Sequence, residues 1–252
     1  MTTFDVYAKE TRWVFISPHF DDAVLSCGGL ISMLAGRGNP VEIMTVNAGI
    51  PEPGPGTELI DRIHAAWKTG TPEETILLRR NEDKNASLRT GAAVCHLSLV
   101  DAIYRRNKAG QYLYTEDVFD PFHEQEQEIV SQAALQISSN LQKEDMVICP
   151  LALGSHVDHV ISRQAVESLG IQLLYYADIP YLFRNRDSLI SAATAFQGID
   201  IKLTKKNLAA WYGGISQYQS QISSLFANET DMVEQITGYW KLKRGITLWK
   251  KI

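Results

Sequence analysis

The chain has 252 residues, of which 45% are hydrophobic and 21% charged, and its formal net charge is −5. This composition is typical of a globular protein and allows one α/β domain. Because the sequence has no basic stripe, nucleic-acid binding is disfavoured, and no apolar run approaches the ~20 residues that span a bilayer. The N-terminus lacks an apolar signal core, and three widely spaced cysteines predict no disulfide framework, so we expect a reducing, cytoplasmic setting.

Strand-like and helix-like segments alternate along the first half of the chain. Apolar runs bounded by Gly and Pro predict strands, and longer amphipathic stretches predict helices. In chain order we expect a buried strand at 13–17, a helix from Ala23 to Gly36, a strand at 41–48, a loop at 49–56, a helix from Glu58 to Lys68, a short strand at 74–78, a helix from Glu82 to Arg89 and a strand at 93–99.

The second half begins with a polar segment at 105–122, which we expect to be a surface loop. Beyond it the pattern predicts a helix from about His123 to Leu141, a strand at 145–150, a helix ending near Gly170, a strand within 171–182, a strand at 199–203 and one or two helices within 205–226. The most basic stretch, "WKLKRGITLWKK" at 240–251, is expected to be a solvated helix or strand face.

This alternation predicts a single α/β domain over 1–252 with a mostly parallel, Rossmann-like sheet covered by helices on both faces. Ligands bind outside the carboxyl ends of the strands in such sheets. No GxGxxG follows the first strand, so we do not expect a dinucleotide.

Two polar clusters follow predicted strands and can meet at this edge. "SPHFDD" follows the first strand and "LGSHVDHV" follows the strand at 145–150. His19 and Asp22 are three residues apart, as are His156 and His159. One carboxylate and two imidazoles are the ligands of a catalytic zinc centre, and equally of a 2-His-1-carboxylate iron site.

Two further acids, Asp21 and Asp158, are available as a base or as partners that orient an imidazole. The spacing by itself leaves other roles open. Asp21 or Asp22 could be the N-cap of the following helix, and the histidines could be hydrogen-bonded residues without a metal.

These segments together resemble the LmbE/PIG-L family of metal-dependent de-N-acetylases. "SPHFDDAVLSCGG" is similar to the family's HPDDE-like motif, and "GSHVDHV" to its HxDH-like motif. "LRRNEDKNASLRTGA" resembles an Arg-bearing helix of the family, and "LSLVDAIYR" its Asp-bearing segment. The resemblance covers 12–182 in order and leaves 183–252 as an unassigned extension of the same domain.

The resemblance implies a role for each matching residue. It makes His19, Asp22 and His159 the metal ligands and Asp21 the general base. His156 would stabilise the tetrahedral intermediate and protonate the leaving amine, with Asp158 as its orienting partner. Arg79 and Asp101 would bind hydroxyl groups of the substrate, with Arg80 as an alternative to Arg79.

Three positions depart from the family pattern. Phe20 and Ala23 replace the Pro and Glu of HPDDE, and Gly154 stands where some sugar deacetylases have a carbonyl-polarising Tyr. A tyrosine of the 105–122 segment could replace it, or the metal and His156 could suffice. This segment and the adjacent Tyr104 are either a plain solvated loop or a mobile rim that shapes the substrate pocket through Tyr104, Tyr112, Tyr114, Asp117 and Asp120.

The implied reaction is hydrolysis of an N-acetyl group on an amino sugar of the N-acetylglucosamine type or on its conjugate. The expected cofactor is Zn²⁺, with Fe²⁺ or another divalent metal as alternatives, and the expected partner is a small molecule. An esterase or amidase acting on a non-sugar remains open, as do a non-catalytic metal-binding scaffold and a homo-oligomer.

Overall fold

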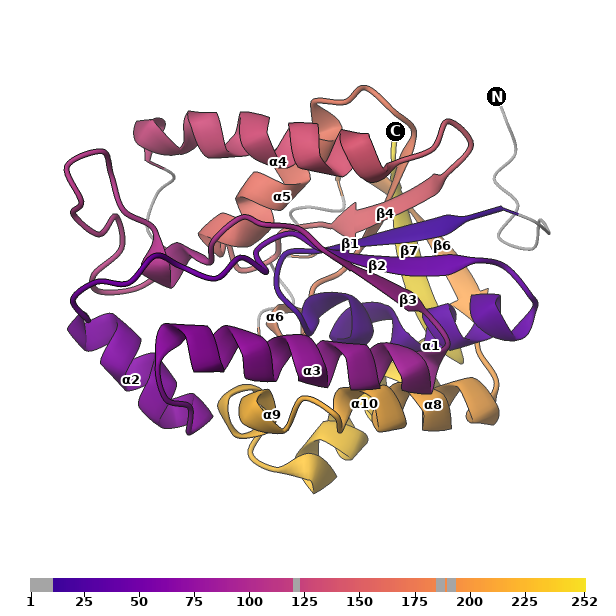
Figure 1. The fold of residues 1–252 in the computed structure, drawn as a ribbon. Coiled ribbons are helices and arrows are strands. Elements are labelled where there is room, and N and C mark those ends of the chain that lie inside the picture. Colours follow the sequence, from indigo (N-terminus) through magenta and orange to yellow (C-terminus); the bar gives the residue numbers. More distant parts are fainter. Residues whose placement is uncertain (1–10, 120–122, 185–188, 190–193) are drawn as a thin grey trace.

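A mixed β-sheet runs through the middle of the molecule (Figure 1). The computed structural model describes residues 11–119, 123–184, 189 and 194–252. Within these residues the sheet has seven strands in the order β3-β2-β1-β4-β5-β7-β6. The strands are β1 (Trp13–Ser17), β2 (Val41–Thr45), β3 (Ala93–His96), β4 (Met146–Pro150), β5 (Leu173–Tyr176), β6 (Phe196–Lys202) and β7 (Gly245–Lys251).

Helices cover both faces of this sheet (Figure 1). α4 and α5 lie together on one face, while α1, α3, α8 and α10 lie on the other. The helices are α1 (Asp22–Gly36), α2 (Glu58–Trp67), α3 (Pro72–Thr90), α4 (Gln127–Asn140), α5 (Val157–Glu167), α6 (Tyr181–Arg184), α8 (Lys205–Ile215), α9 (Gln219–Leu225) and α10 (Glu229–Lys243), with 3₁₀ turns η1 (Ala102–Tyr104) and η2 (Glu124–Glu126).

The first five strands are parallel, and β7 is antiparallel to both β5 and β6. The mostly parallel sheet with helices on both faces is therefore confirmed. The chain passes from β1 to β2 on one side, whereas β4 pairs with β1 on the other side. This reversal opens a crevice at the carboxyl ends of β1 and β4, where α/β sheets bind their ligands.

The central strand and its helix form the core. All five residues of β1 are buried, as a parallel strand covered on both faces requires. Trp211 of α8 packs against α1, where a Cβ at Gly28 would lie 2.6 Å from its ring. The Trp211 indole N–H points at the backbone carbonyls of Val24 and Leu25. The C-terminal third thus packs directly on the helix that begins at the first polar cluster.

The strand predicted at 74–78 is wrong, because these residues lie inside α3. A capping box starts this helix: Thr71 accepts a hydrogen bond from the Glu74 N–H, and Glu74 accepts one from the Thr71 N–H. Pro72 occupies the first turn, where its missing N–H costs nothing. Leu77 and Leu78 are more than 40% exposed, so the apolar run does not mark a buried strand.

The basic C-terminal stretch is also not simply a solvated face. It covers the end of α10 and then β7, which lies between β5 and β6. Ile246 and Leu248 are buried in the core. The helix expected from His123 begins as the η2 turn and becomes α4 only at Gln127. Within the described part of the chain, no helix combines the length and apolar character needed to cross a bilayer.

Candidate active site

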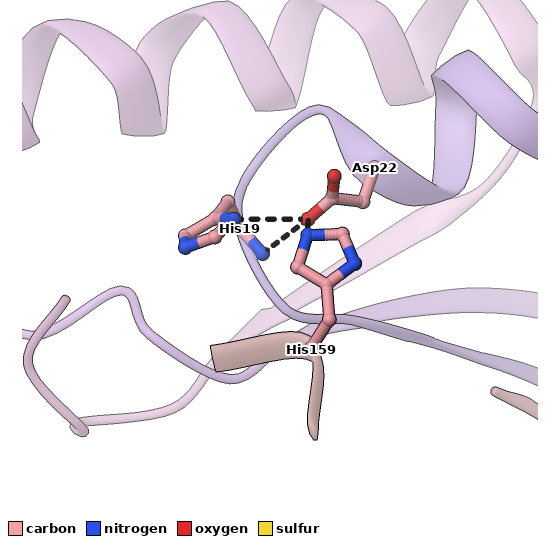
Figure 2. Close-up of side chains that lie close together, drawn as sticks. All are labelled: His19, Asp22 and His159. Atoms are coloured by element: carbon pink, nitrogen blue, oxygen red, sulfur yellow. Dashed lines mark hydrogen bonds and ion pairs between the residues drawn. The ribbon is translucent and has the colours of Figure 1, made fainter. Parts of the chain in front are cut away.

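Three predicted ligands meet at the carboxyl ends of β1 and β4 (Figure 2). His19 lies in the turn after β1, Asp22 begins α1, and His159 lies in the first turn of α5. The Asp22 Oδ2 atom is 3.2 Å from His19 Nδ1 and 3.3 Å from His159 Nε2. One ligand atom from each residue can be chosen so that all three lie within 4.8 Å of one another, and all three residues are buried. Two imidazoles and a carboxylate so arranged match a three-ligand divalent metal site.

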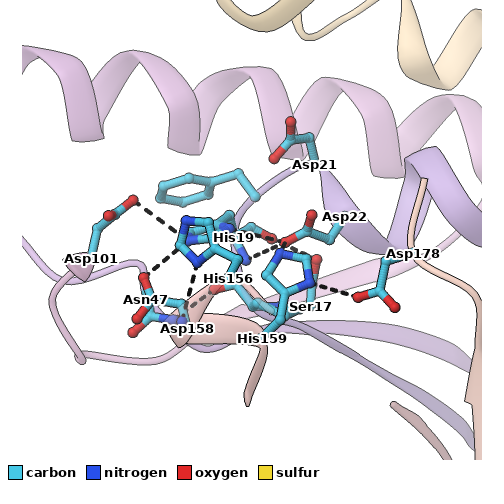
Figure 3. A network of polar contacts seen from close by, with 12 residues as sticks. Ser17, His19, Asp21, Asp22, Asn47, Asp101, His156, Asp158, His159 and Asp178 are labelled. Atoms are coloured by element: carbon cyan, nitrogen blue, oxygen red, sulfur yellow. Dashed lines mark hydrogen bonds and ion pairs between the residues drawn. The ribbon is translucent and has the colours of Figure 1, made fainter. Parts of the chain in front are cut away.

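The imidazole of His19 is oriented by a second carboxylate (Figure 3). Its Nε2 atom lies 3.0 Å from the Oδ2 atom of Asp158. Because an ionised carboxylate only accepts hydrogen bonds, the ring proton belongs on Nε2. Nδ1 is then left facing Asp22, as in metal sites where an outer carboxylate fixes the tautomer of a ligand.

His159 has the same arrangement with its nitrogens exchanged. Its Nδ1 atom lies 2.6 Å from the Oδ1 atom of Asp178, which leaves Nε2 facing Asp22. The other oxygen of Asp178 accepts the Leu153 N–H at 3.1 Å. Asp178 was not predicted as a site residue. The sequence indicates it only weakly, because it is a single acid just after β5 at the same edge of the sheet.

Opposite charges stabilise this triad. Burial lowers the pKa of His159, but Asp22 and Asp178 outweigh burial and raise it to about 9. Burial would raise the pKa of Asp22, whereas the two imidazoles hold it well below its ordinary value. Without metal, a proton on His159 pairs with the Asp22 carboxylate. A divalent metal must displace that proton, so metal binding weakens as the pH falls.

A second group, formed by His19, His156 and Asp158, also has the residue types of a metal site. The carboxylate of Asp158 is already occupied, because it accepts the Ala102 N–H at 3.0 Å and lies 2.5 Å from Arg105 Nη1. Burial alone would raise the pKa of Asp158, but Arg105 and His19 hold it well below its ordinary value. Its partners make Asp158 an orienting group for His19, and the first triad is the better metal site.

Asp21 lines the same cavity as Asp22 but contacts a different group. Its Oδ1 atom lies 3.2 Å from Nη2 of Arg79 in α3. Burial raises the pKa of Asp21 to about 6, and the Arg79 guanidinium opposes a larger rise. A carboxylate with this pKa is ionised at neutral pH and is basic enough to accept a proton from water.

Arg79 is almost fully buried at the side of the site. Its guanidinium carbon lies 4.5 Å from the Trp67 ring centre and 5.2 Å from that of Phe20. The carboxylate of Asp101 is 3.9 Å from Arg79 Nη1. Arg80, the alternative, instead donates two hydrogen bonds to the Ala48 carbonyl. Of the two arginines, Arg79 is therefore the one beside Asp21 and Asp101.

His156 stands next to the triad at the N-cap of α5. Its Nδ1 atom accepts the backbone N–H of Asp158 at 3.1 Å, so a neutral ring carries its proton on Nε2. Burial, and then the neighbouring His19, lower the pKa of His156. The ring is therefore neutral at rest, and Asp158 holds it through its backbone rather than through its carboxylate.

A cavity of about 180 Å³ opens over these groups. Its wall comes from α2, α9, the start of α6 and the segment before η2. The lining side chains outside the polar cluster include Ile63, Trp67, Val118, Tyr181, Gln221 and Leu225.

Tyr181 fills the space beside Gly154. A Cβ on residue 154 would lie 2.4 Å from Cδ1 of the Tyr181 ring, and Gly154 has a φ of +82° that favours glycine. The ring also lies edge-on to His159, with centroids 5.6 Å apart. The aromatic ring nearest to residue 154, where some sugar deacetylases have a tyrosine, thus comes from α6.

The tyrosines expected from the 105–122 segment point elsewhere. Tyr104 hydrogen-bonds His64, Tyr112 donates to the Pro55 carbonyl, and Tyr114 donates to Glu126. Asp117 accepts the Phe119 N–H, and Asp120 lies outside the described residues. Of the described residues of this segment, Val118 lines the cavity, and the Phe119 ring lies edge-on to His156 with centroids 5.5 Å apart.

Comparison with known proteins assigns this arrangement to a family. Residues 14–169 match the family model described as PIG-L, GlcNAc-PI de-N-acetylase. The chain belongs to this family. It is 30% identical over 242 residues to the 2'-N-acetylparomamine deacetylase of Niallia circulans, covering 87% of this chain and 84% of the relative. The predicted family and the de-N-acetylase activity are confirmed.

Solved structures agree with that assignment. A zinc-inhibited form of teicoplanin deacetylase superimposes with a TM-score of 0.83 at 26% identity, covering 96% of this chain and 98% of the neighbour. The deacetylase of the A40926 pseudoaglycone superimposes with a TM-score of 0.77, also at 26% identity, covering 97% and 98% of the two chains. The matches cover 96–97% of this chain, so the shared fold extends beyond residues 14–169 into the C-terminal third.

Proposed function

We propose that this protein is a divalent-metal hydrolase that removes the N-acetyl group from an amino sugar within a larger conjugate. One observation carries the proposal. His19 and His159 each have one ring nitrogen held by a buried carboxylate and the other directed at the same oxygen of Asp22. A neighbouring acid, Asp21, has the pKa of a general base.

The donor set fits a metal ion. His19, Asp22 and His159 would hold it, since their ligand atoms converge and Asp158 and Asp178 fix both imidazoles. When bound, a divalent metal polarises the amide carbonyl and lowers the pKa of water toward ~7. A site with three protein ligands leaves room for water and substrate, as catalytic zinc sites do.

Asp21 accepts a proton from the attacking water. Its side chain is buried, which raises its pKa, and the positive charge of Arg79 limits that rise. The same ion pair, at 3.2 Å, holds the carboxylate on the α3 side of the cavity, apart from Asp22. The two adjacent acids therefore have different roles: Asp22 binds the metal, and Asp21 accepts the proton.

His156 acts on the other side of the scissile bond. Since Nδ1 accepts the Asp158 N–H, the Nε2–H group is the donor available to the developing oxyanion of the tetrahedral intermediate. To protonate the leaving nitrogen as well, the ring must gain at Nδ1 the proton that Asp21 took from the water, and Nδ1 must then give up its hydrogen bond to the Asp158 N–H. The Nε2–H proton then passes to the leaving nitrogen, because an amine leaves an amide only when protonated. Free amine and acetate are the products.

We propose Zn²⁺ as the metal, with Fe²⁺ as the alternative, because two imidazoles and one carboxylate suit both ions. The solved structure of teicoplanin deacetylase is of a zinc-inhibited form, so any assay must distinguish the effect of one equivalent of zinc from the effect of excess zinc. For the substrate, the relatives are named as deacetylases of 2'-N-acetylparomamine, of teicoplanin and of the A40926 pseudoaglycone. We propose a sugar of the N-acetylglucosamine type attached to such a scaffold.

The test is release of acetate from a panel of N-acetylated and O-acetylated amino sugars and aminoglycoside conjugates. Protein stripped by a chelator is assayed alone and after one equivalent of Zn²⁺, Fe²⁺, Co²⁺ or Mn²⁺. We expect cleavage of N-acetyl groups, absent after stripping and restored by metal. Preferential cleavage of O-acetyl esters or of non-sugar amides would contradict the proposed substrate and favour the esterase or amidase alternative.

A further inference from the structure

A buried arginine next to the site has no role in the chemistry described above. Arg105 is 5% exposed and lies between two carboxylates, Asp158 and Glu126, that are both fully buried. Its Nη1 atom is 2.5 Å from Asp158 Oδ1, and its Nε atom is 2.8 Å from Glu126 Oε1. These contacts lack the alignment of hydrogen bonds, so they act as ion pairs. Buried charges of this kind are retained only when they are paired.

The two ends of η1 converge on the Asp158 carboxylate. The N–H of Ala102, the first residue of η1, donates to Oδ2 at 3.0 Å. Arg105, which follows the last residue of the turn, lies against Oδ1. Asp158 Oδ2 in turn contacts His19 Nε2 at 3.0 Å. One short segment, 102–105, therefore encloses the carboxylate that orients a metal ligand.

Arg105 has further contacts on the side away from Asp158. Glu126 pairs with the guanidinium and accepts a hydrogen bond from Tyr114, whose ring lies 5.8 Å from the Arg105 guanidinium carbon. The Arg105 carbonyl accepts the Leu113 N–H at 3.0 Å. A continuous line of buried polar contacts thus runs from Tyr114 through Glu126, Arg105 and Asp158 to the ligand His19.

We propose that Arg105 is a positioning residue for the metal centre: it fixes Asp158 against His19 Nε2 and thereby directs His19 Nδ1 at the metal position. This inference rests on the proposed metal-dependent function. Without Arg105, Asp158 would be a buried carboxylate free to turn toward other donors, and His19 could change its tautomer. Both changes weaken the ligand without removing it.

The experiment measures metal affinity of the purified protein by competition with a chromogenic chelator, using Zn²⁺ and Co²⁺ as probes. Arg105→Met removes the charge, and Arg105→Lys keeps a charge but cannot span two carboxylates with one ammonium. Arg106→Met is the matched control, since Arg106 contacts Tyr112 and the Pro53 carbonyl away from Asp158. The melting temperature of each metal-free variant is measured in parallel.

For Arg105→Met we expect a metal Kd about 10- to 100-fold higher than that of the wild type, the usual effect of losing a group that orients a ligand. Arg106→Met should keep the wild-type Kd. A lower melting temperature of metal-free Arg105→Met with an unchanged Kd would show a purely structural role and overturn the proposal. If Arg105→Met does not fold, Arg105→Lys carries the test, with an expected increase of about 10-fold.

The same data separate this inference from the proposed function. A wild-type protein that binds neither Zn²⁺ nor Co²⁺ would contradict the metal centre, and the role of Arg105 would fall with it. Normal metal binding by both the wild type and Arg105→Met would contradict only the role of Arg105.

Discussion

The metal-binding end of the site and the outer wall of its cavity are built in different ways. His19 comes from the turn after β1 and His159 from the first turn of α5, and each is fixed by a buried carboxylate at 2.6–3.0 Å. The wall comes from α2, α9 and α6, whose Trp67, Tyr181 and Leu225 pack through apolar and aromatic surfaces. Buried polar groups must be paired in one geometry, whereas apolar packing tolerates exchange at similar volume. Substitutions in the two regions should therefore separate metal binding from substrate selection.

The largest effect is expected from removing two ligands together. The double variant His19→Ala, His159→Ala should fall from one metal ion per chain to near zero and lose measurable activity, because Asp22 alone cannot hold a divalent ion. Elemental analysis and the acetate assay check this outcome. His123→Ala is the control, since His123 is exposed and outside the site. A metal content equal to that of the wild type would rule out this ligand set.

The next effect separates the two adjacent acids. Asp21→Asn removes the proton acceptor but no ligand, so it should keep its metal and lose about 10²–10⁴-fold in kcat. Asp22→Asn should lose metal, and added metal should partly restore its activity. Metal stoichiometry and kcat are measured for both variants on the same N-acetyl amino sugar. Loss of metal from Asp21→Asn with retention by Asp22→Asn would reverse the assigned roles.

An intermediate effect is expected at Asp178. Asp178→Asn keeps the size of the side chain but replaces the charged partner of His159 Nδ1. The metal Kd should rise about 10- to 100-fold, while kcat at saturating metal stays near the wild-type value. Asp61→Asn, an exposed acid of α2, is the matched control. An unchanged Kd would mean that the tautomer of His159 is fixed by the metal itself.

The metal end could be predicted from the sequence because its residues are consecutive and follow apolar strands. "HFDD" and "HVDH" each place a ligand and a spare acid within four residues, and the α/β pattern brings both strand ends to one edge. Asp178 could not be assigned in this way. Its segment "YADIP" holds one acid, and its role depends on β5 pairing with β4. Only that pairing brings Asp178 within reach of His159.

The cavity wall and the burial of β7 were not predictable for a related reason, whereas the strand expected at 199–203 and the helices expected within 205–226 correspond to β6, α8 and α9. Trp67 and Leu225 line the cavity only because α2 and α9 pack there, and nothing in their own segments indicates a site. A strand at 245–251 was among the interpretations of the basic stretch, but its burial was missed because lysines flank a short apolar run. That burial depends on the insertion of β7 between β5 and β6. At 74–78 the local apolar run suggested a strand, but the capping signal at Thr71 and Glu74 determined the structure.

The smallest effect is expected on the wall, at Tyr181. Tyr181→Phe removes a hydroxyl and keeps the ring beside His159, so metal content should not change. Because Tyr181 lines the cavity, we expect its hydroxyl to donate one hydrogen bond to the substrate, and loss of that bond should lower kcat/KM about 2- to 10-fold. Tyr175→Phe, whose hydroxyl bonds Glu167 away from the cavity, is the control. An equal loss in both variants would remove Tyr181 from the substrate site.

A second substitution at the same place sharpens this prediction. Gly154→Ala puts a Cβ 2.4 Å from the Tyr181 ring and strains a backbone with φ of +82°. It should displace the ring and lower kcat/KM more than Tyr181→Phe does, again with metal retained. In the double variant Gly154→Ala, Tyr181→Ala the steric conflict is gone. Its effect on kcat/KM should therefore be smaller than the sum of the effects of Gly154→Ala alone and Tyr181→Ala alone. Strict additivity in kcat/KM would show that Gly154 and Tyr181 act independently, and that Tyr181 does not occupy the space that a side chain at residue 154 would need.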